Sequence, residues 1–202
     1  MIELSDVINA ARDKQTIGID GWPVSGKSTL AEQLQRDIGA VCLYLDDFVL
    51  PESQWPVPHR PGYPFPYIRY DAFLDAARQL ATQRHCVLQP YDWASGELGP
   101  SRILTAEDRP VVIEGVSALC EVLAPLYDLR IWVESDLQST LLAAEARGTG
   151  TWSAKWRDYF LPSVGHYAIT RPRERADLIV RGRGLSAPSA HAPLSASVRI
   201  AD

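Results

Sequence analysis

Residues 21–28 have the composition and spacing of a phosphate-binding loop. They read Gly-Trp-Pro-Val-Ser-Gly-Lys-Ser and match the pattern G-x-x-x-x-G-K-[ST] in full. In such a loop, backbone N–H groups turn inward around phosphate oxygens, the lysine neutralises β- and γ-phosphate charge, and the serine hydroxyl can ligate Mg²⁺. We predict that ATP and Mg²⁺ bind here, through Gly21, Trp22, Pro23, Val24, Ser25, Gly26, Lys27, Ser28 and Thr29.

Acidic residues end two further apolar runs. Asp46 and Asp47 follow the run 41–45, and Glu114 follows the run 111–113. At the carboxyl ends of parallel strands such acids face bound phosphates. Only one of the two adjacent acids, Asp46 or Asp47, should do so, because successive side chains of an extended segment point to opposite faces. One of this pair can accept a hydroxyl proton and help hold the metal. Glu114 either holds Mg²⁺ or caps the following helix, and the role of Asp20, which has a similar location, stays open.

The elements that must position these residues are short strands alternating with helices. This order predicts an α/β protein of the P-loop NTPase type, a three-layer α/β/α sandwich with a mostly parallel five-stranded sheet and a lid. The predicted strands are 16–20, 41–45, 111–113, 129–133 and 178–180, and the predicted helices are 4–14, 27–38, 71–84, 116–123, 136–147 and 155–168.

Length and composition favour one domain over residues 1–181 of the 202. Residues 51–66 contain six prolines among aromatic residues, which excludes a helix or a central strand and indicates an insert at about 51–70 over one edge of the sheet. The insert either shapes the acceptor pocket or only packs as an edge loop. The tail 182–202 is rich in Ala, Ser and Pro, carries little that could form a core, and is expected to be loosely attached.

The net charge of −5 argues against a general nucleic-acid binder, whose surface would be basic. Cys42, Cys86 and Cys120 show no metal-ligand spacing and are expected to be buried thiols in a reducing compartment. The sequence has no basic, apolar leader and no uncharged apolar run of about 18 residues. We expect a cytoplasmic protein that is a monomer or a homo-oligomer. Its expected partner is a small-molecule substrate, and we expect it to bind neither a membrane nor nucleic acid.

Several segments together resemble the uridine kinase and nicotinamide riboside kinase branch of the P-loop kinases, a group that includes phosphoribulokinase and bacterial pantothenate kinase. They cover about residues 15–180 and comprise the phosphate loop, Asp46-Asp47-Phe48-Val49-Leu50-Pro51-Glu52-Ser53, Tyr70-Asp71, Pro90-Tyr91-Asp92-Trp93, Val112-Ile113-Glu114-Gly115 and Ala176-Asp177-Leu178-Ile179-Val180.

This resemblance implies transfer of the γ-phosphoryl group of ATP to a hydroxyl of a nucleoside-like substrate of the uridine or nicotinamide riboside type. Asp46 then matches the catalytic base, Lys27 holds the phosphates, and Ser28, Asp46 and Glu114 organise Mg²⁺. Asp71 matches the carboxylate that holds the ribose hydroxyls, and Tyr70 would line the same pocket.

Tyr91 and Trp93 lie in a segment that resembles the base-stacking region of uridine kinases, and we predict that they bind the acceptor together with Arg60. Gly96 stands where uridine kinases have a base-reading histidine, three residues after the aromatic. The identity of the acceptor therefore stays open: it is a nucleoside, a sugar, a pantothenate-like compound or a specialised metabolite.

The resemblance also implies a lid at about 148–168 that supplies an arginine to the transferring phosphoryl group. Arg147 matches this position best, with Lys155 and Arg157 as the other candidates. Three arginines further along either reach the nucleotide or form an exposed turn: Arg171, Arg173 and Arg175. The rival to a kinase is a nucleotide-binding regulatory protein that has the loop but does not transfer phosphate.

Overall fold

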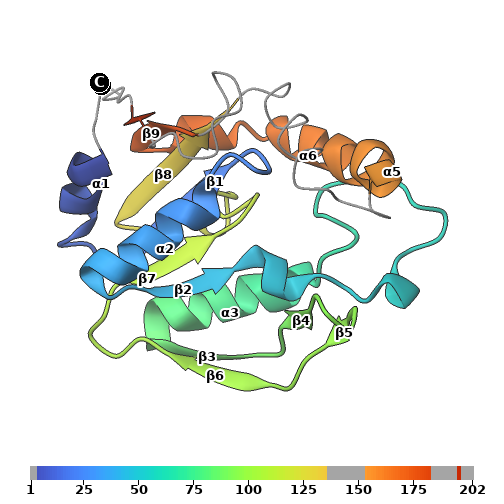
Figure 1. Ribbon diagram of the computed structural model, residues 1–202, viewed down its shortest axis with the longest axis horizontal. Coiled ribbons are helices and arrows are strands. Elements are labelled where there is room, and N and C mark those ends of the chain that lie inside the picture. Colours follow the sequence, from blue (N-terminus) through green and yellow to red (C-terminus); the bar gives the residue numbers. More distant parts are fainter. Residues whose placement is uncertain (1–3, 136–152, 183–194, 197–202) are drawn as a thin grey trace.

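The structure is a computed structural model that describes residues 4–135, 153–182 and 195–196 (Figure 1). Its central sheet has the strand order β10-β9-β8-β1-β7-β2. The strands are β1 Thr16–Gly21, β2 Val41–Tyr44, β7 Val111–Glu114, β8 Leu129–Glu134, β9 Leu178–Arg181 and β10 Ser195–Ala196. All neighbours pair in parallel except β10, which is antiparallel to β9. The predicted parallel five-stranded sheet is confirmed, and β10 adds an edge strand that we did not predict from the tail.

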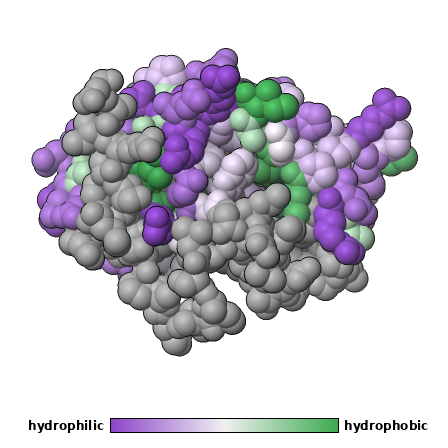
Figure 2. All heavy atoms as spheres, turned by 90° about the horizontal axis from the view of Figure 1, so that it is seen from above, coloured by the Kyte–Doolittle hydropathy of each residue, from purple (hydrophilic) through white to green (hydrophobic). Residues whose placement is uncertain are grey.

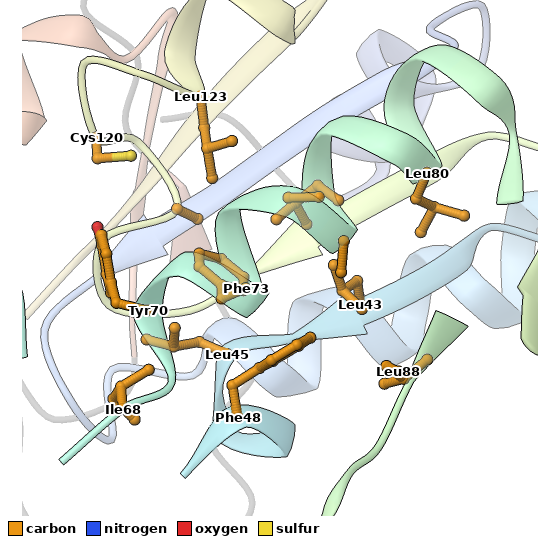
Figure 3. Close-up of a cluster of buried hydrophobic side chains, with 14 of the residues drawn as sticks. Leu43, Leu45, Phe48, Ile68, Tyr70, Phe73, Leu80, Leu88, Cys120 and Leu123 are labelled. Carbon is orange, nitrogen blue, oxygen red and sulfur yellow. The ribbon is translucent and has the colours of Figure 1, made fainter. Parts of the chain in front are cut away.

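Helices cover both faces of this sheet, which gives three layers (Figure 1). On one face α1 Leu4–Ala11 and α2 Lys27–Ile38 pack on β1, β7, β8 and β9. On the other face α3 Tyr70–Gln83 and the turns after β7 pack on β2 and β7, where Figure 3 shows Leu43, Phe73 and Leu80 in the core. Burial on both faces explains why these strands are mostly apolar.

The register of the strands fixes where their last residues lie. Ile19 of β1 and Tyr44 of β2 both pair with Glu114 at the end of β7. The carboxyl ends of these three strands therefore meet at one edge of the sheet, which is where ligands bind in open α/β sheets.

Two small antiparallel pairs lie outside the central sheet. β3 His85–Leu88 pairs with β6 Arg102–Thr105, and β4 Tyr91–Asp92 pairs with β5 Glu97–Leu98. The sequence analysis predicted none of these strands. Buried and exposed residues alternate along β3, which is the pattern of a strand with one solvated face.

The region after residue 114 differs from the predicted helix 116–123. This prediction is wrong, because the chain forms successive turns there and one 3₁₀ turn at Ala124–Leu126. Ser117 has a positive φ of 91°, and the N–H groups of Ser117 and Leu119 donate to the Asp20 carboxylate. The buried carboxylate thus takes backbone donors, and the left-handed residue prevents a regular helix from starting.

The remaining helical segments complete the fold. The predicted helix 155–168 is present as α5 Ser153–Lys155, a π-helical turn Trp156–Phe160 and α6 Leu161–Ala168. Three short 3₁₀ turns are Leu45–Phe48, Glu52–Gln54 and Pro172–Arg175. The predicted helix 136–147 lies outside the described residues.

Among the described residues, no helix is both long and apolar enough to cross a membrane. Figure 2 views the molecule from the side on which β9 and α6 lie, and hydrophilic side chains there are interspersed with apolar ones.

Candidate active site

The loop between β1 and α2 depends on two glycines. Gly26, immediately before α2, has a φ of 106°, a conformation that L side chains rarely adopt. At Gly21 a Cβ would lie 2.3 Å from the backbone oxygen of Val133. The loop is therefore folded tightly against β8, and Trp22 continues this packing with its ring edge-to-face against Trp132 at 5.4 Å between centroids.

Lys27 and Ser28 begin α2 beneath this loop. The Lys27 side chain is buried, and its Nζ donates to the Trp22 carbonyl oxygen at 2.8 Å. Ser28 Oγ donates to Glu114 Oε2 at 3.4 Å, so the helix start is joined to the end of β7. These contacts place one cation, one hydroxyl and one carboxylate at the amino end of a helix, where the helix dipole favours anions.

The oxygen atoms at this position fit Mg²⁺ in number and kind. Magnesium in nucleotide sites is bound by one or two carboxylates together with phosphates and water. Glu114 and the Ser28 hydroxyl supply such ligands, and the described residues contain no cluster of three or more His, Cys, Asp or Glu that would form an all-protein metal cage. The Ser25 hydroxyl is buried in the loop with no partner within the described chain, and it offers a further donor to phosphate oxygens.

Glu114 is almost fully buried, and burial raises the pKa of its carboxyl from 4.5 to about 7. This value includes smaller contributions: the charges of Asp46 and Asp20 raise the pKa, whereas Lys27 and the Ser28 hydrogen bond lower it. The site therefore holds a carboxylate whose ionised form is costly unless a cation accompanies it.

Asp46 and Asp47 point in different directions from the 3₁₀ turn that follows β2. Asp46 is exposed and lines the cavity described below, whereas Asp47 Oδ2 accepts from Arg102 at 3.1 Å. The Asp47 carbonyl also accepts from Arg69 at 2.9 Å. As expected, only one acid of the pair faces the phosphate loop. The two acids belong to a 3₁₀ turn, however, and not to an extended strand.

One cavity of about 200 Å³ lies between the phosphate loop, the end of β7, the insert and α6. Six of the nine predicted loop residues line it, while the other three, Gly21, Trp22 and Ser25, form the base of the loop. The described residues that line the cavity are Pro23, Val24, Gly26, Lys27, Ser28, Thr29, Leu45, Asp46, Val49, Phe65, Tyr67, Ile68, Trp93, Glu114, Gly115, Val116, Phe160 and Val164.

Four of the predicted acceptor-binding residues lie outside this lining. Tyr70 is buried in the core, where its hydroxyl is 2.7 Å from that of Tyr63. Asp71 is exposed on the first turn of α3, and Arg60 is exposed in the insert. Tyr91 is buried and packs edge-to-face on Trp93, which does line the cavity.

The predicted lid residues have other partners or lie elsewhere. Arg147 lies outside the described residues. Lys155 forms an ion pair with Glu52 and lies 5.2 Å from the centre of a Trp55 ring, and Arg157 is exposed and does not line the cavity. From the helical segment that follows, apolar side chains reach the cavity.

The three arginines near residue 173 form surface ion pairs. Arg173 binds Glu134 at 2.7 Å, Arg175 binds Glu121 at 2.9 Å, and Arg171 lies 3.8 Å from Glu174. These contacts fix the turn that leads into β9, which supports the exposed-turn interpretation of this run.

An aromatic cluster joins the insert to the helical segment 153–168, and the sequence analysis did not predict this contact. Trp55 packs on Tyr159 and Phe160, and Tyr67 packs on Phe160 at 4.4 Å between ring centroids. The density of aromatic residues between prolines was the available signal, but it did not reveal their partner about 100 residues away. Through this cluster the insert forms one wall of the cavity.

Asp20 has a structural role that the sequence left open. Its fully buried carboxylate accepts hydrogen bonds from the N–H groups of Gly21, Ser117 and Leu119 at 2.6, 3.1 and 2.8 Å. The Tyr167 hydroxyl of α6 donates to it at 2.5 Å. Through these hydrogen bonds Asp20 ties the phosphate loop to α6 and to the turns after β7. Burial nevertheless raises the pKa of Asp20, which means that keeping its carboxylate ionised in this position costs free energy.

No protein-family model matches the chain, and neither does any curated protein at a significant level. Solved structures do match it. One, described as a possible uridine kinase from Bacillus stearothermophilus, has a TM-score of 0.66 and 18% identity, and the match covers 87% of this chain and 96% of that one. Another, a candidate fructose transport system kinase from Silicibacter sp. TM1040, has a TM-score of 0.59 and 19% identity, with the same coverage. This chain has a P-loop kinase-like fold.

Proposed function

We propose that this chain is an ATP-dependent small-molecule kinase that transfers the γ-phosphoryl group to a hydroxyl of its acceptor. The observation that carries the proposal is a single cavity shared by the phosphate loop and an acceptor-side acid. Lys27 and Ser28 line one wall, and Asp46 lines the same cavity opposite an apolar wall. A protein that only bound nucleotide would need no carboxylate beside an acceptor-sized space.

Each side chain has a defined part in this reaction. Lys27 and the loop N–H groups bind and orient the phosphates, and Asp46 accepts the proton of the acceptor hydroxyl on its carboxylate. Ser28, Glu114 and Asp46 would hold Mg²⁺, which when bound neutralises phosphate charge. The apolar side chains on the other wall exclude water from the acceptor hydroxyl.

The identity of the acceptor has to be argued from other observations than the reaction class. A nucleoside of the uridine or nicotinamide riboside type is the prediction from sequence resemblance, and the similarity to a possible uridine kinase supports it. The side chains on which that prediction depended, such as Tyr70 and Asp71, do not line the cavity. We therefore propose the reaction class without committing it to nucleosides, and we keep the predicted cytoplasmic setting without a nucleic-acid partner.

The test measures ATP consumption with a panel of acceptors: uridine, cytidine, nicotinamide riboside, pantothenate, pentoses, hexoses and simple alcohols. We expect at least one acceptor to stimulate turnover, and Asp46→Asn to lower kcat by about 10²-fold or more with ATP binding retained. Asp47→Asn is the matched control, because this neighbouring acid pairs with Arg102 and should leave kcat nearly unchanged.

Two results would contradict the proposal. If ATP binds and no acceptor stimulates its consumption, the regulatory nucleotide-binding protein becomes the better interpretation. If Asp46→Asn keeps full acceptor-dependent turnover, the transfer reaction stands but Asp46 is not the proton acceptor.

A further inference from the structure

The wall of the cavity that faces the phosphate loop is apolar over its described residues. It combines side chains from the segment after the 3₁₀ turn 45–48, the insert, the β4–β5 hairpin, the turns after β7 and the helical segment 153–168. They are Val49, Phe65, Tyr67, Ile68, Trp93, Val116, Phe160 and Val164. All are apolar except at the Tyr67 hydroxyl and the Trp93 indole N–H, so this wall favours an apolar surface on the ligand.

Charged groups are few on this side. The described lining contains the carboxylates Asp46 and Glu114 and the cation Lys27, and all three lie toward the phosphate loop. The cations of the insert and the helical segment face elsewhere: Lys155 pairs with Glu52, and Arg60 is exposed outside the lining. An anionic acceptor would find two carboxylates and no described cation on the apolar wall. A cationic acceptor would lose its hydration against this wall, where aromatic faces and no described carboxylate would face it.

The wall also offers few hydrogen-bond partners to a polyol. Asp71, the carboxylate predicted to hold a ribose diol, is exposed outside the lining, and the Tyr70 hydroxyl is held in the core by Tyr63. Sugar hydroxyls placed against valine, isoleucine and phenylalanine would give up hydrogen bonds to water without replacement. Asp46 and Tyr67 both line the cavity, so its lining offers one carboxylate and one phenol to an acceptor hydroxyl.

The size of the cavity narrows the choice further. The whole space, including that for the transferring phosphoryl group, is about 200 Å³. An apolar cavity of about 150 Å³ holds one benzene molecule. Inside the cavity the acceptor body thus has room for about one ring, and any larger part would extend into solvent.

We propose that the acceptor is an uncharged alcohol whose apolar body is about the size of one aromatic or aliphatic ring, recognised by the apolar wall and by one hydroxyl, without contacts to a diol. This inference rests on the proposed kinase function and specifies its substrate class.

The test compares kcat/KM for four groups of acceptors with the full chain and Mg-ATP, using release of ADP. The apolar group is benzyl alcohol, 2-phenylethanol, cyclohexylmethanol and 3-methylbutanol. The others are the polyols uridine, ribose and glycerol, the cation choline, and the anions pantothenate and glycerate. We expect a member of the apolar group to exceed every other acceptor by at least about tenfold, as differences in apolar contact produce.

Trp93→Ala gives a direct measure of the apolar wall. Its ring lines the cavity and is 58% exposed, so its removal should not prevent folding. We expect the KM for the preferred alcohol to rise about tenfold or more, the KM for ATP to stay constant, and Trp93→Phe to restore most of the loss. Ile103→Ala is the control, because this residue is 70% exposed on β6 and does not line the cavity.

The outcomes separate the inference from the function beneath it. If a polyol, choline or an anion is turned over faster than the apolar alcohols, or if Trp93→Ala leaves the acceptor KM unchanged, the substrate class is wrong and the kinase function stands. If ATP protects the chain from thermal unfolding and no acceptor of any group is phosphorylated, the proposed function fails and the substrate class fails with it.

Discussion

Glu114→Gln should make the protein more stable at neutral pH while impairing its proposed metal binding. The buried carboxyl of Glu114 has a pKa raised from 4.5 to about 7, mainly by burial. The Glu114 carboxyl binds a proton less tightly in the unfolded chain than in the folded chain. The free energy of unfolding of the wild type therefore falls as the pH rises between these two pKa values. Above pH 7 this pKa shift lowers the free energy of unfolding of the wild type by about 3 kcal/mol. A neutral glutamine of the same shape avoids that cost.

The assay is urea unfolding followed by circular dichroism at pH 5, 6, 7 and 8 in the presence of EDTA. We expect the free energy of unfolding of Glu114→Gln to exceed that of the wild type by about 1 kcal/mol at pH 5 and by about 3 kcal/mol at pH 7 and 8. Glu97→Gln is the matched control: this glutamate is exposed on β5, and its replacement should change stability by less than about 0.5 kcal/mol at any pH.

A Glu114→Gln variant that is less stable than the wild type at pH 8 would refute this reasoning. So would a stability difference that stays constant from pH 5 to pH 8. Either result would mean that Lys27 and the Ser28 hydroxyl stabilise the ionised carboxylate by at least as much as burial destabilises it. In activity assays the same variant should need a higher Mg²⁺ concentration for half-maximal turnover if Glu114 holds the metal.

Three further substitutions test contacts around the site. Tyr167→Phe removes the hydroxyl donor to the buried Asp20 and should lower the free energy of unfolding by about 1–3 kcal/mol in urea titrations. Gly18→Ala places a Cβ 2.5 Å from the Tyr127 ring and should cost about 1–3 kcal/mol through overpacking, measured in the same way. Trp55→Ala removes the centre of the aromatic cluster and should speed proteolytic cleavage within residues 51–66, measured by limited proteolysis of the native protein.

Each substitution has a matched control. Tyr159→Phe removes a buried hydroxyl that has no partner within the described chain, and it should cost less than Tyr167→Phe. Gly165→Ala adds a Cβ with nothing within 4 Å in α6 and should be neutral or stabilising, unlike Gly18→Ala. Ile169→Ala changes an exposed residue just after α6 and should leave proteolysis of the insert unchanged. Equal effects of a variant and its control would contradict the corresponding contact.

Local features of the site followed directly from the sequence. The phosphate loop is encoded by its own glycines and by the residues Lys27 and Ser28, since backbone conformation and helix start are decided within a few residues. The five parallel strands were predicted because strands buried on both faces are apolar without interruption. The position of Glu114 at a strand end, and hence its place near the loop, followed from that order.

Tertiary structure decided which residues meet at the site. Lys155 was a candidate phosphate ligand by its charge, but it pairs with Glu52 from the insert, 103 residues away. Asp71 was a candidate acceptor ligand by resemblance, but the packing of α3 leaves it exposed outside the cavity.

By itself, then, the sequence determined the fold class, the glycine-dependent turn between β1 and α2 and the acids at the strand ends, because those depend on neighbouring residues and on the burial period of each strand. Only the tertiary structure decided which of Asp46 and Asp47 lines the cavity, what the buried Asp20 binds, and that aromatic residues of the insert and of the helical segment 153–168 form one wall of that cavity. These contacts join side chains dozens of residues apart, and only the packing of whole elements brings such partners together.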